Sequence, residues 1–360
     1  MSRSHSLSPE QVAELAAEID KIRDVHRADL GAKDARYIRR LVRISLGLRA
    51  AGRLTLMFGF GPVFWLLGVA ALGIGKILEN MEIGHNVMHG QYDWMNDPRL
   101  DSQTYEWDGV APSDDWRYTH NVVHHNHTNV IGLDGDLGYG VMRMSELQTW
   151  RPRFKRQFFL GMLTTLVFEW GVGLHRAEIG KMRDGELPRE EIMRRLKPFG
   201  AKAKYWAFRD YVLFPALAFW HWPYVLLGNL AGNLVRNIWA AMIIFCGHFP
   251  KNVRVYTQEQ IRNETRGDWY IRQIEGSANI EGGRWLYVLS GHLSHQIEHH
   301  LFPDIPSWRY PQIAPQVRAL CEKYGVEYTT GPFLSQYAQA LGRIWRLRRP
   351  DGVAGVPVSA

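Results

Sequence analysis

The chain has 360 residues, 46% of them hydrophobic, a formal net charge of +7 and only two cysteines. Two cysteines without a CxxC pair exclude a thiolate zinc site, an iron–sulfur cluster and a disulfide framework. The hydrophobic content is ordinary for a soluble protein, but the apolar residues are concentrated in a few long blocks. We therefore expect an all-α polytopic membrane protein with about four transmembrane helices in two hairpins.

The N-terminal 40 residues are polar and carry apolar residues at helical spacing (Val12, Leu15, Ile19). They predict an N-terminal cytosolic helical segment over residues 1–40 rather than a signal peptide. Residues 41–348 are expected to form one membrane domain with a cytosolic cap. Residues 349–360 read as a loose tail.

The first apolar block covers residues 46–83, with Gly61-Pro62 as its turn signal. Its first limb is the weaker one, because Arg49 and Arg53 interrupt it. Aromatic residues are frequent near the ends of the apolar blocks, as in membrane interfaces, which favours membrane spans over two buried soluble hairpins.

The second apolar block predicts passes at Tyr211–Leu227 and Leu230–Gly247, with a turn at Gly228-Asn229. Between the blocks, Phe158–Leu174 is apolar but contains Glu169. We expect a helix in the membrane plane there, in preference to a re-entrant segment or a core helix.

Eight of the 15 histidines lie in three short windows. On a helix, a spacing of four places the rings about one turn apart on one face. A single pair at this spacing is usually an ordinary surface or core pair, but three windows are hard to produce by chance. Neutral imidazole binds iron, zinc or copper, and eight rings exceed the needs of one tetrahedral ion, which indicates two metals. The windows contain His85 and His89; His120, His124 and His125; and His295, His299 and His300.

Each hairpin returns to the face from which it started, and the polar segment 90–120 is expected to loop back without crossing. The three windows therefore meet in one cap, which the positive-inside rule places on the cytoplasmic side. His248 ends the last limb at the same level, so we predict it as a ninth ligand. The predicted set does not include four other histidines: His127, His175, His221 and His292.

Polar residues near the windows are candidates to bind metal or to orient the rings. Gln296 lies inside the third window, and Glu82 lies three residues before His85 on the same helical face. Asp134 and Asp136 follow the second window in a glycine-rich turn, and we predict that they orient its histidines. The sequence leaves open whether His295, His292 or Gln296 completes the metal shell.

The windows HNVMH, HNVVHH and QIEHH resemble the histidine boxes of the membrane-bound fatty acid desaturases, and ENMEIGHNVMHGQYDWMND and HQIEHHLFPDIPSWRY extend the resemblance. The resemblance implies a four-pass protein of the inner cell membrane with a cytosolic di-iron cap. It implies oxygen-dependent removal of two hydrogens from a saturated fatty acyl chain, with stearoyl-CoA desaturated at position 9 as the expected reaction. No HPGG haem motif or dinucleotide fingerprint is visible. Electrons from NADPH are therefore expected through a separate electron-transfer protein or reductase.

Basic runs at residues 181–204 and 343–349 suit an acidic donor protein or acyl-CoA phosphates, and no motif indicates nucleic acid binding.

The main alternative function is that of a di-iron hydroxylase of alkane, sterol or carotenoid type, since fold does not fix function. A metal transporter is less favoured, because few ionisable residues would line a membrane path. Chain length, acyl carrier, double-bond position, electron donor and oligomeric state stay open.

Overall fold

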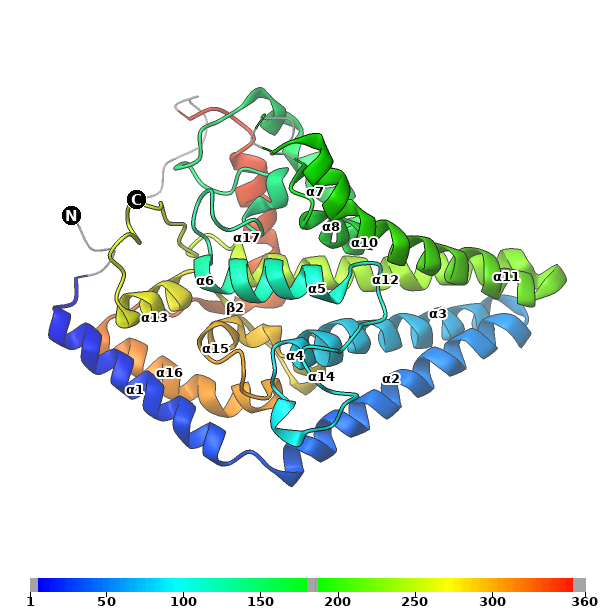
Figure 1. Ribbon diagram of the computed structural model, residues 1–360, viewed down its shortest axis with the longest axis horizontal. Helices are drawn as coiled ribbons and strands as arrows, with labels where there is room; N and C mark the ends of the chain where they lie inside the picture. Colours follow the sequence, from blue (N-terminus) through cyan, green and yellow to red (C-terminus); the bar gives the residue numbers. More distant parts are fainter. Residues whose placement is uncertain (1–5, 180–184, 186, 352–360) are drawn as a thin grey trace.

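The computed structural model describes residues 6–179, 185 and 187–351, and these fold mainly into helices. The long helices α2 (Ala32–Phe58), α3 (Gly61–Ile77) and α12 (Trp222–His248) extend together toward one end of the molecule (Figure 1). Shorter helices surround the opposite ends of α3 and α12 and form the cap. The expected all-α class is confirmed. In the described residues the only strands are β1 (Asn279–Glu281) and β2 (Thr330–Pro332), which pair in parallel.

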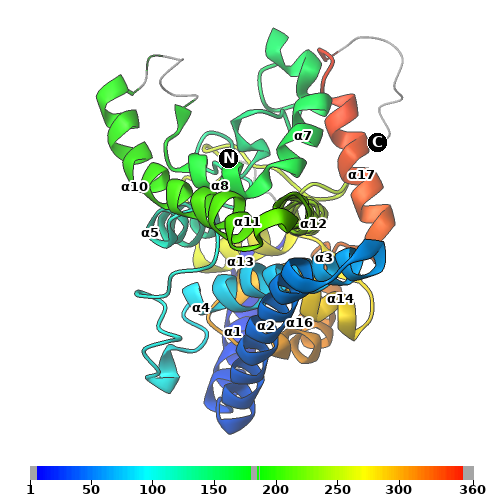
Figure 2. The same cartoon turned by 90° about the vertical axis from the view of Figure 1, so that its right-hand side faces the viewer.

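The first hairpin consists of α2 and α3, and its turn lies where the sequence predicted it. Gly61 has a φ of +81°, which suits glycine, and Pro62 follows in the first turn of α3. The two helices touch closely at Gly52, where a Cβ would lie 2.6 Å from the backbone nitrogen of Leu72. Figure 2 shows the molecule from the end at which these helices join, with α12 nearly end-on.

The second hairpin has a different turn from the predicted one. The segment α10 (Arg189–Phe208), η6 (Arg209–Leu213) and α11 (Phe214–Leu217) leads to a turn at η7 (Phe219–His221), and α12 then runs unbroken through Gly228-Asn229. The prediction of a turn at Gly228-Asn229 was therefore wrong. A Cβ at Gly228 would lie 2.5 Å from Leu56 of α2, and the Asn229 amide donates to the Asp210 carbonyl at 2.6 Å. These small and polar residues serve helix packing here.

Among the described residues, two helices are long and apolar enough to cross a membrane, Gly61–Met88 and Phe219–His248. The pair Pro152–Leu166 and Phe168–His175 would be a third span if counted as one, but it bends by 99°. The predicted number of four is therefore approximate. Helix α2 and the α10–α11 segment pack beside the two clear spans as the other limbs of the hairpins.

Charged side chains within the helical bundle are paired. Asp210 lies 2.6 Å from the Lys76 ammonium and 2.9 Å from the Arg53 guanidinium, so one carboxylate links α2, α3 and η6. Glu169 pairs with Arg236 of α12. A buried charge in an apolar setting is stable only with such a partner.

Helix α1 (Pro9–Ala28) packs on the cap through Val12, Leu15 and Ile19, against residues of α13, α15 and α16. Helix α2 runs unbroken across residue 40, where the sequence suggested a boundary. Most of the expected tail, residues 352–360, lies outside the described residues. The other elements are α4 (His85–Met88), α5 (Ser113–Trp116), α6 (His125–His127), α7 (Gln157–Leu166), α8 (Phe168–His175), α13 (Arg266–Glu275), α14 (Arg284–Leu289), α15 (Gln296–Leu301), α16 (Tyr310–Tyr324), α17 (Phe333–Arg346), and the short η1 (Leu78–Gly84), η2 (Asp93–Met95), η3 (Arg117–His124), η4 (Gly138–Gly140), η5 (Pro152–Arg156), η8 (Leu293–His295) and η9 (Ser307–Arg309).

Candidate metal centre and substrate cavity

The histidine windows lie on helix ends that meet at the cap side of the bundle. The first window is the end of the helix that α3 begins, reached through the π-helical segment η1. The second spans η3, also a π-helix, and α6, while His248 is the last residue of α12 and the third window includes α15. In η3 the His125 N–H bonds to the His120 carbonyl, so these two residues are one wide turn apart. Short π-helical segments of this kind are frequent at functional sites.

Seven histidines form two groups in which one ring nitrogen from each member lies within 4.8 Å of the others. The His125 ring lies between the groups, with its centroid 4.6 Å from that of His89 and 4.5 Å from that of His300. The structure therefore brings together eight of the nine predicted histidines. The first group is His85, His89, His120 and His299, and the second is His124, His248 and His300.

The structure does not bring His295 into this cluster. Its ring packs on Tyr287 of α14 at 4.7 Å between centroids, and its Nδ1 lies 3.2 Å from the Ser294 hydroxyl. The next residue, Gln296, points into the cluster instead. Its side-chain nitrogen is 3.0 Å from His248 Nε2, and its buried Oε1 has no hydrogen-bond partner.

Five of the clustered rings are held neutral by burial, and several buried ring nitrogens have lone pairs that no hydrogen bond uses. Burial lowers the pKa values of five imidazoles well below the ordinary value, and the neighbouring rings lower these pKa values further. The five residues are His89, His120, His125, His299 and His300. Several buried nitrogens have no hydrogen-bond partner, including Nε2 of His85, His89, His120 and His299 and both nitrogens of His125. Buried polar atoms are rarely left unpaired. This set of neutral nitrogen donors therefore fits transition metal ions such as iron.

Asp134 and Asp136, the acids predicted to orient the second window, lie beside its rings. Both oxygens of Asp134 are 3.1 Å from His124 Nδ1, while Asp136 approaches Nδ1 of His120 and His124 at 3.6 and 3.7 Å. Burial alone would lower the pKa of His124, but the two carboxylates raise it to about 9. Negative charge behind the ring makes its other nitrogen a better donor to a cation.

Other histidines have neutral partners behind them. His300 Nδ1 lies 3.0 Å from the Gln273 side-chain oxygen and 3.2 Å from the Thr128 hydroxyl. His85 Nδ1 lies 3.1 Å from the Asn86 side-chain oxygen. These three partners are not among the residues predicted from the sequence.

Glu82 lies elsewhere than the sequence suggested. It is fully buried, but it accepts hydrogen bonds from Tyr37 at 2.7 Å and Ser307 at 3.1 Å and lies 2.9 Å from His292 Nδ1. It has no recorded contact with His85. The π-helical turn between Glu82 and His85 breaks the three-residue spacing on which the prediction relied.

Of the histidines left aside, His175 of α8 is close to the candidate centre, because its Nδ1 lies 3.4 Å from Asp136. His292 faces Glu82, and His221 bonds to the Gly59 carbonyl at the far end of α12. The sequence contains no local signal for the contact between His175 and Asp136, since the two residues come from separate segments.

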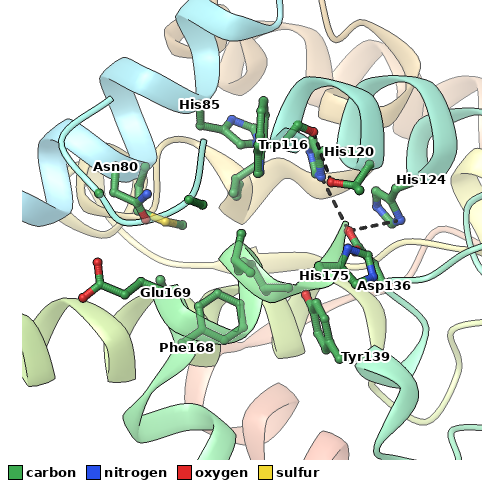
Figure 3. Close-up of a pocket in the computed structure, with 18 of the residues that line it drawn as sticks. Asn80, His85, Trp116, His120, His124, Asp136, Tyr139, Phe168, Glu169 and His175 are labelled. Carbon is green, nitrogen blue, oxygen red and sulfur yellow. Dashed lines mark hydrogen bonds and ion pairs between the residues drawn. The ribbon is translucent and has the colours of Figure 1, made fainter. Parts of the chain in front are cut away.

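A cavity opens beside the histidines between α8, α12 and the second window (Figure 3). It reaches along α12 from His248 to Arg236, which is about 18 Å of helix. Apolar side chains line much of its length, and the Glu169–Arg236 pair lies at the end away from His248. The apolar lining residues include Met81, Trp107, Val110, Trp116, Phe168, Val172, Ala240 and Ile244. A long apolar cavity next to a nitrogen-rich cluster is suited to a hydrocarbon chain.

Comparisons with known proteins agree with this chemistry. Residues 60–332 match the fatty acid desaturase family model. The chain is 45% identical over 349 residues to an NADPH-dependent stearoyl-CoA 9-desaturase of Mycobacterium tuberculosis, covering 96% of this chain and 82% of that protein. It is 30% identical over 288 residues to an sn-1 linoleoyl-lipid 6-desaturase of Synechocystis, covering 76% and 78% of the two chains. A shorter match, 36% identical over 132 residues, covers 36% of this chain and 28% of human fatty acid desaturase 3.

The family model covers most of the chain, and both the apolar cavity and the histidine cluster lie within the matched region. The chain therefore belongs to the fatty acid desaturase family, and it is a membrane-bound oxidoreductase that desaturates fatty acyl chains with oxygen.

Proposed function

We propose that this desaturase converts stearoyl-CoA to the 9-unsaturated ester at two iron ions held by the eight clustered histidines. The observation that carries the proposal is the convergence of these eight rings, many with buried nitrogens that have no hydrogen-bond partner. The proposed ligands are His85, His89, His120, His124, His125, His248, His299 and His300, with Gln296 as a further candidate beside His248. His295 is not part of the proposed set.

The reaction defines what the protein must supply. A saturated –CH2–CH2– segment, O2, two electrons and two protons give –CH=CH– and two water molecules. Bound iron supplies the O2 chemistry that breaks an unactivated C–H bond, which ordinary acids, bases and nucleophiles cannot do.

The residues of the chain position the substrate and the ligands. The cavity holds the acyl chain away from water, with His85, His120 and His124 in its wall next to Trp116. Asp134 and Asp136 fix the orientation of the histidine rings of the second window through their Nδ1 atoms. The register of the chain against the histidine cluster then selects which carbons react.

The acyl carrier is the main choice within this proposal. The relative with 45% identity is named for a CoA ester and the cyanobacterial one for an acyl lipid. We propose the CoA ester, because the more similar relative is named for it and because α10 and α17 carry basic residues, which suit the phosphates of CoA. Part of the basic run 181–204 lies outside the described residues.

We further propose that the cap faces the cytoplasm at the inner cell membrane and receives NADPH electrons through a separate protein. The basic C-terminal end of α17 and the residues that follow it, with Arg346 and Arg349, would favour an acidic donor. Association steered by charge slows as salt screens it. Turnover with donor should therefore fall with ionic strength.

The test uses the purified full-length protein with bound iron measured. Stearoyl-CoA, O2, NADPH and a ferredoxin-type donor with its reductase should yield oleoyl-CoA, identified by mass spectrometry with the double bond located. Stearoyl phospholipid in the same assay should give no product. A hydroxylated product, or turnover without any donor protein, would contradict the proposal. Expression in a desaturase-deficient host gives the same readout in a cell.

A further inference from the structure

Asp136 occupies an unusual position among the acids near the cluster, because it contacts a histidine from each of the two groups. Its Oδ2 is 3.6 Å from His120 Nδ1 and 3.7 Å from His124 Nδ1. His120 belongs to the first group of nitrogens and His124 to the second. One carboxylate can therefore affect the ring orientation of a ligand at both proposed irons.

The neighbouring Asp134 is held differently. Its carboxylate accepts the backbone N–H of Asn129 at 2.8 Å and that of Asp136 at 2.9 Å, so the main chain fixes it. Among the described residues, the recorded side-chain contacts of Asp136 are imidazoles alone. The third of these rings is His175, whose Nδ1 lies 3.4 Å from Asp136 Oδ1 (Figure 3).

His175 reaches Asp136 because the chain leaves room for its ring. It is the last residue of α8, and a Cβ at Gly135 would lie 2.6 Å from His175 Nε2 and 2.8 Å from its Cε1. The ring therefore occupies space that any side chain at position 135 would need. The Tyr139 ring packs on the same imidazole at 5.9 Å between centroids.

We propose that His175 is a positioning residue that holds Asp136 between His120 and His124, so that one carboxylate orients a ligand of each iron. This inference rests on the proposed di-iron function. His175 itself is not a ligand in the proposal. Its ring also lines the acyl cavity, so the same contact joins the cavity wall to both halves of the centre.

The test compares three substitutions at one position. His175→Asn keeps an N–H where Nδ1 stands, His175→Gln moves it to the place of Nε2, and His175→Leu removes it. Each variant is reconstituted with iron and measured for iron content, Mössbauer spectrum, kcat and KM. We expect the Leu and Gln variants to retain iron, to change the signals of both irons and to lose about 10–100-fold in kcat with KM unchanged, as losses behind metal ligands do. The Asn variant should restore the spectrum and most of kcat.

Two further variants separate positioning from packing. Gly135→Ala keeps the histidine but displaces its ring, so it should reproduce the spectral change of His175→Leu. Combining Asp136→Asn with His175→Leu should be no worse than Asp136→Asn alone, because His175 acts through Asp136. His26→Gln on α1, far from the cluster, is the control and should match the wild type.

A His175→Leu protein with wild-type iron signals, a loss confined to KM, or an Asn variant as poor as the Leu variant would overturn the inference. The proposed function fails separately, when the wild-type protein binds no iron or makes no unsaturated product.

Discussion

At the scale of single residues, the structure separates histidines that the sequence could not distinguish. His295 and His299 stand in the same window, four residues apart, and both are buried. Both ring nitrogens of His299 lack hydrogen-bond partners, while His295 contacts Ser294 and Tyr287. The spacing correctly indicated eight of the residues that cluster, but it could not show that the third window enters its helix at Gln296 and turns His295 away.

We expect His299→Ala to lower bound iron and abolish turnover, because it removes a donor from the first group. His295→Ala is the matched control from the same window and should keep its iron. Metal analysis of both purified proteins measures the difference. Equal loss of iron in the two variants would mean that the proposed set is incomplete.

Asp134→Asn should reduce activity by about 10–100-fold while the protein stays folded, because the His124 ring loses a charged partner. The amide still accepts one hydrogen bond, so the effect should be smaller than that of losing the ligand His124. Measuring the rate and the iron content together distinguishes the loss of this carboxylate from the loss of the ligand His124. An unchanged rate would make Asp134 a simple loop acid.

At the scale of elements, helix periodicity predicted the existence of the main helices but not their local winding. The turn at Gly61-Pro62 was predicted because glycine and proline determine it locally. Gly228-Asn229 also contains a glycine, yet it lies within α12. There Leu56 packs against Gly228, and the Asn229 side chain donates a hydrogen bond to the Asp210 carbonyl. The π-helical turns of η1 and η3 have no sequence signature of this kind, so the relation of Glu82 to His85 could not be read from spacing.

Because α2 packs closely on α3, we expect replacement of two glycines of α2 by alanine to change the stability of the protein by very different amounts. Gly52→Ala would place a methyl group 2.6 Å from the Leu72 backbone and should destabilise the protein by about 1–3 kcal/mol. Gly47 has nothing within 4 Å of a Cβ, so Gly47→Ala should be neutral or stabilising through helix propensity. Thermal unfolding in detergent compares them. Equal melting temperatures would show that the hairpin tolerates wider spacing.

At the scale of the whole molecule, the two hairpins depend on charge pairing that composition could not reveal. Arg49 and Arg53 made the first limb of the first hairpin a poor candidate for a membrane span by composition. In the structure Arg53 forms an ion pair with Asp210 of the second hairpin, and Lys76 forms an ion pair with the same carboxylate. Such long-range pairs link residues more than a hundred positions apart, and a single sequence does not show them. The helical membrane class was predicted correctly, while the predicted number of spans was only approximate.

Asp210→Asn should lower stability by about 3–5 kcal/mol, because it leaves Lys76 and Arg53 buried without their counter-charge. Adding Lys76→Met should recover part of the loss. Asp97→Asn is the control, since the Asp97–Arg99 contact involves an exposed arginine and such pairs contribute little. Unfolding in detergent at fixed protein concentration provides the measurement. A loss as small as that of the control would mean that water reaches the pair.

The order in which the clustered histidines occur along the chain has a consequence for biosynthesis. His85 and His89 leave the ribosome early, but His299 and His300 follow only after both hairpins have been made. Each proposed metal group contains a ring from this last window, so neither can be complete while the chain is still threading into the bilayer. In the proposed di-iron protein both groups would therefore be completed only at the end of synthesis, and a nascent chain stalled before residue 299 should bind less iron than the full-length chain.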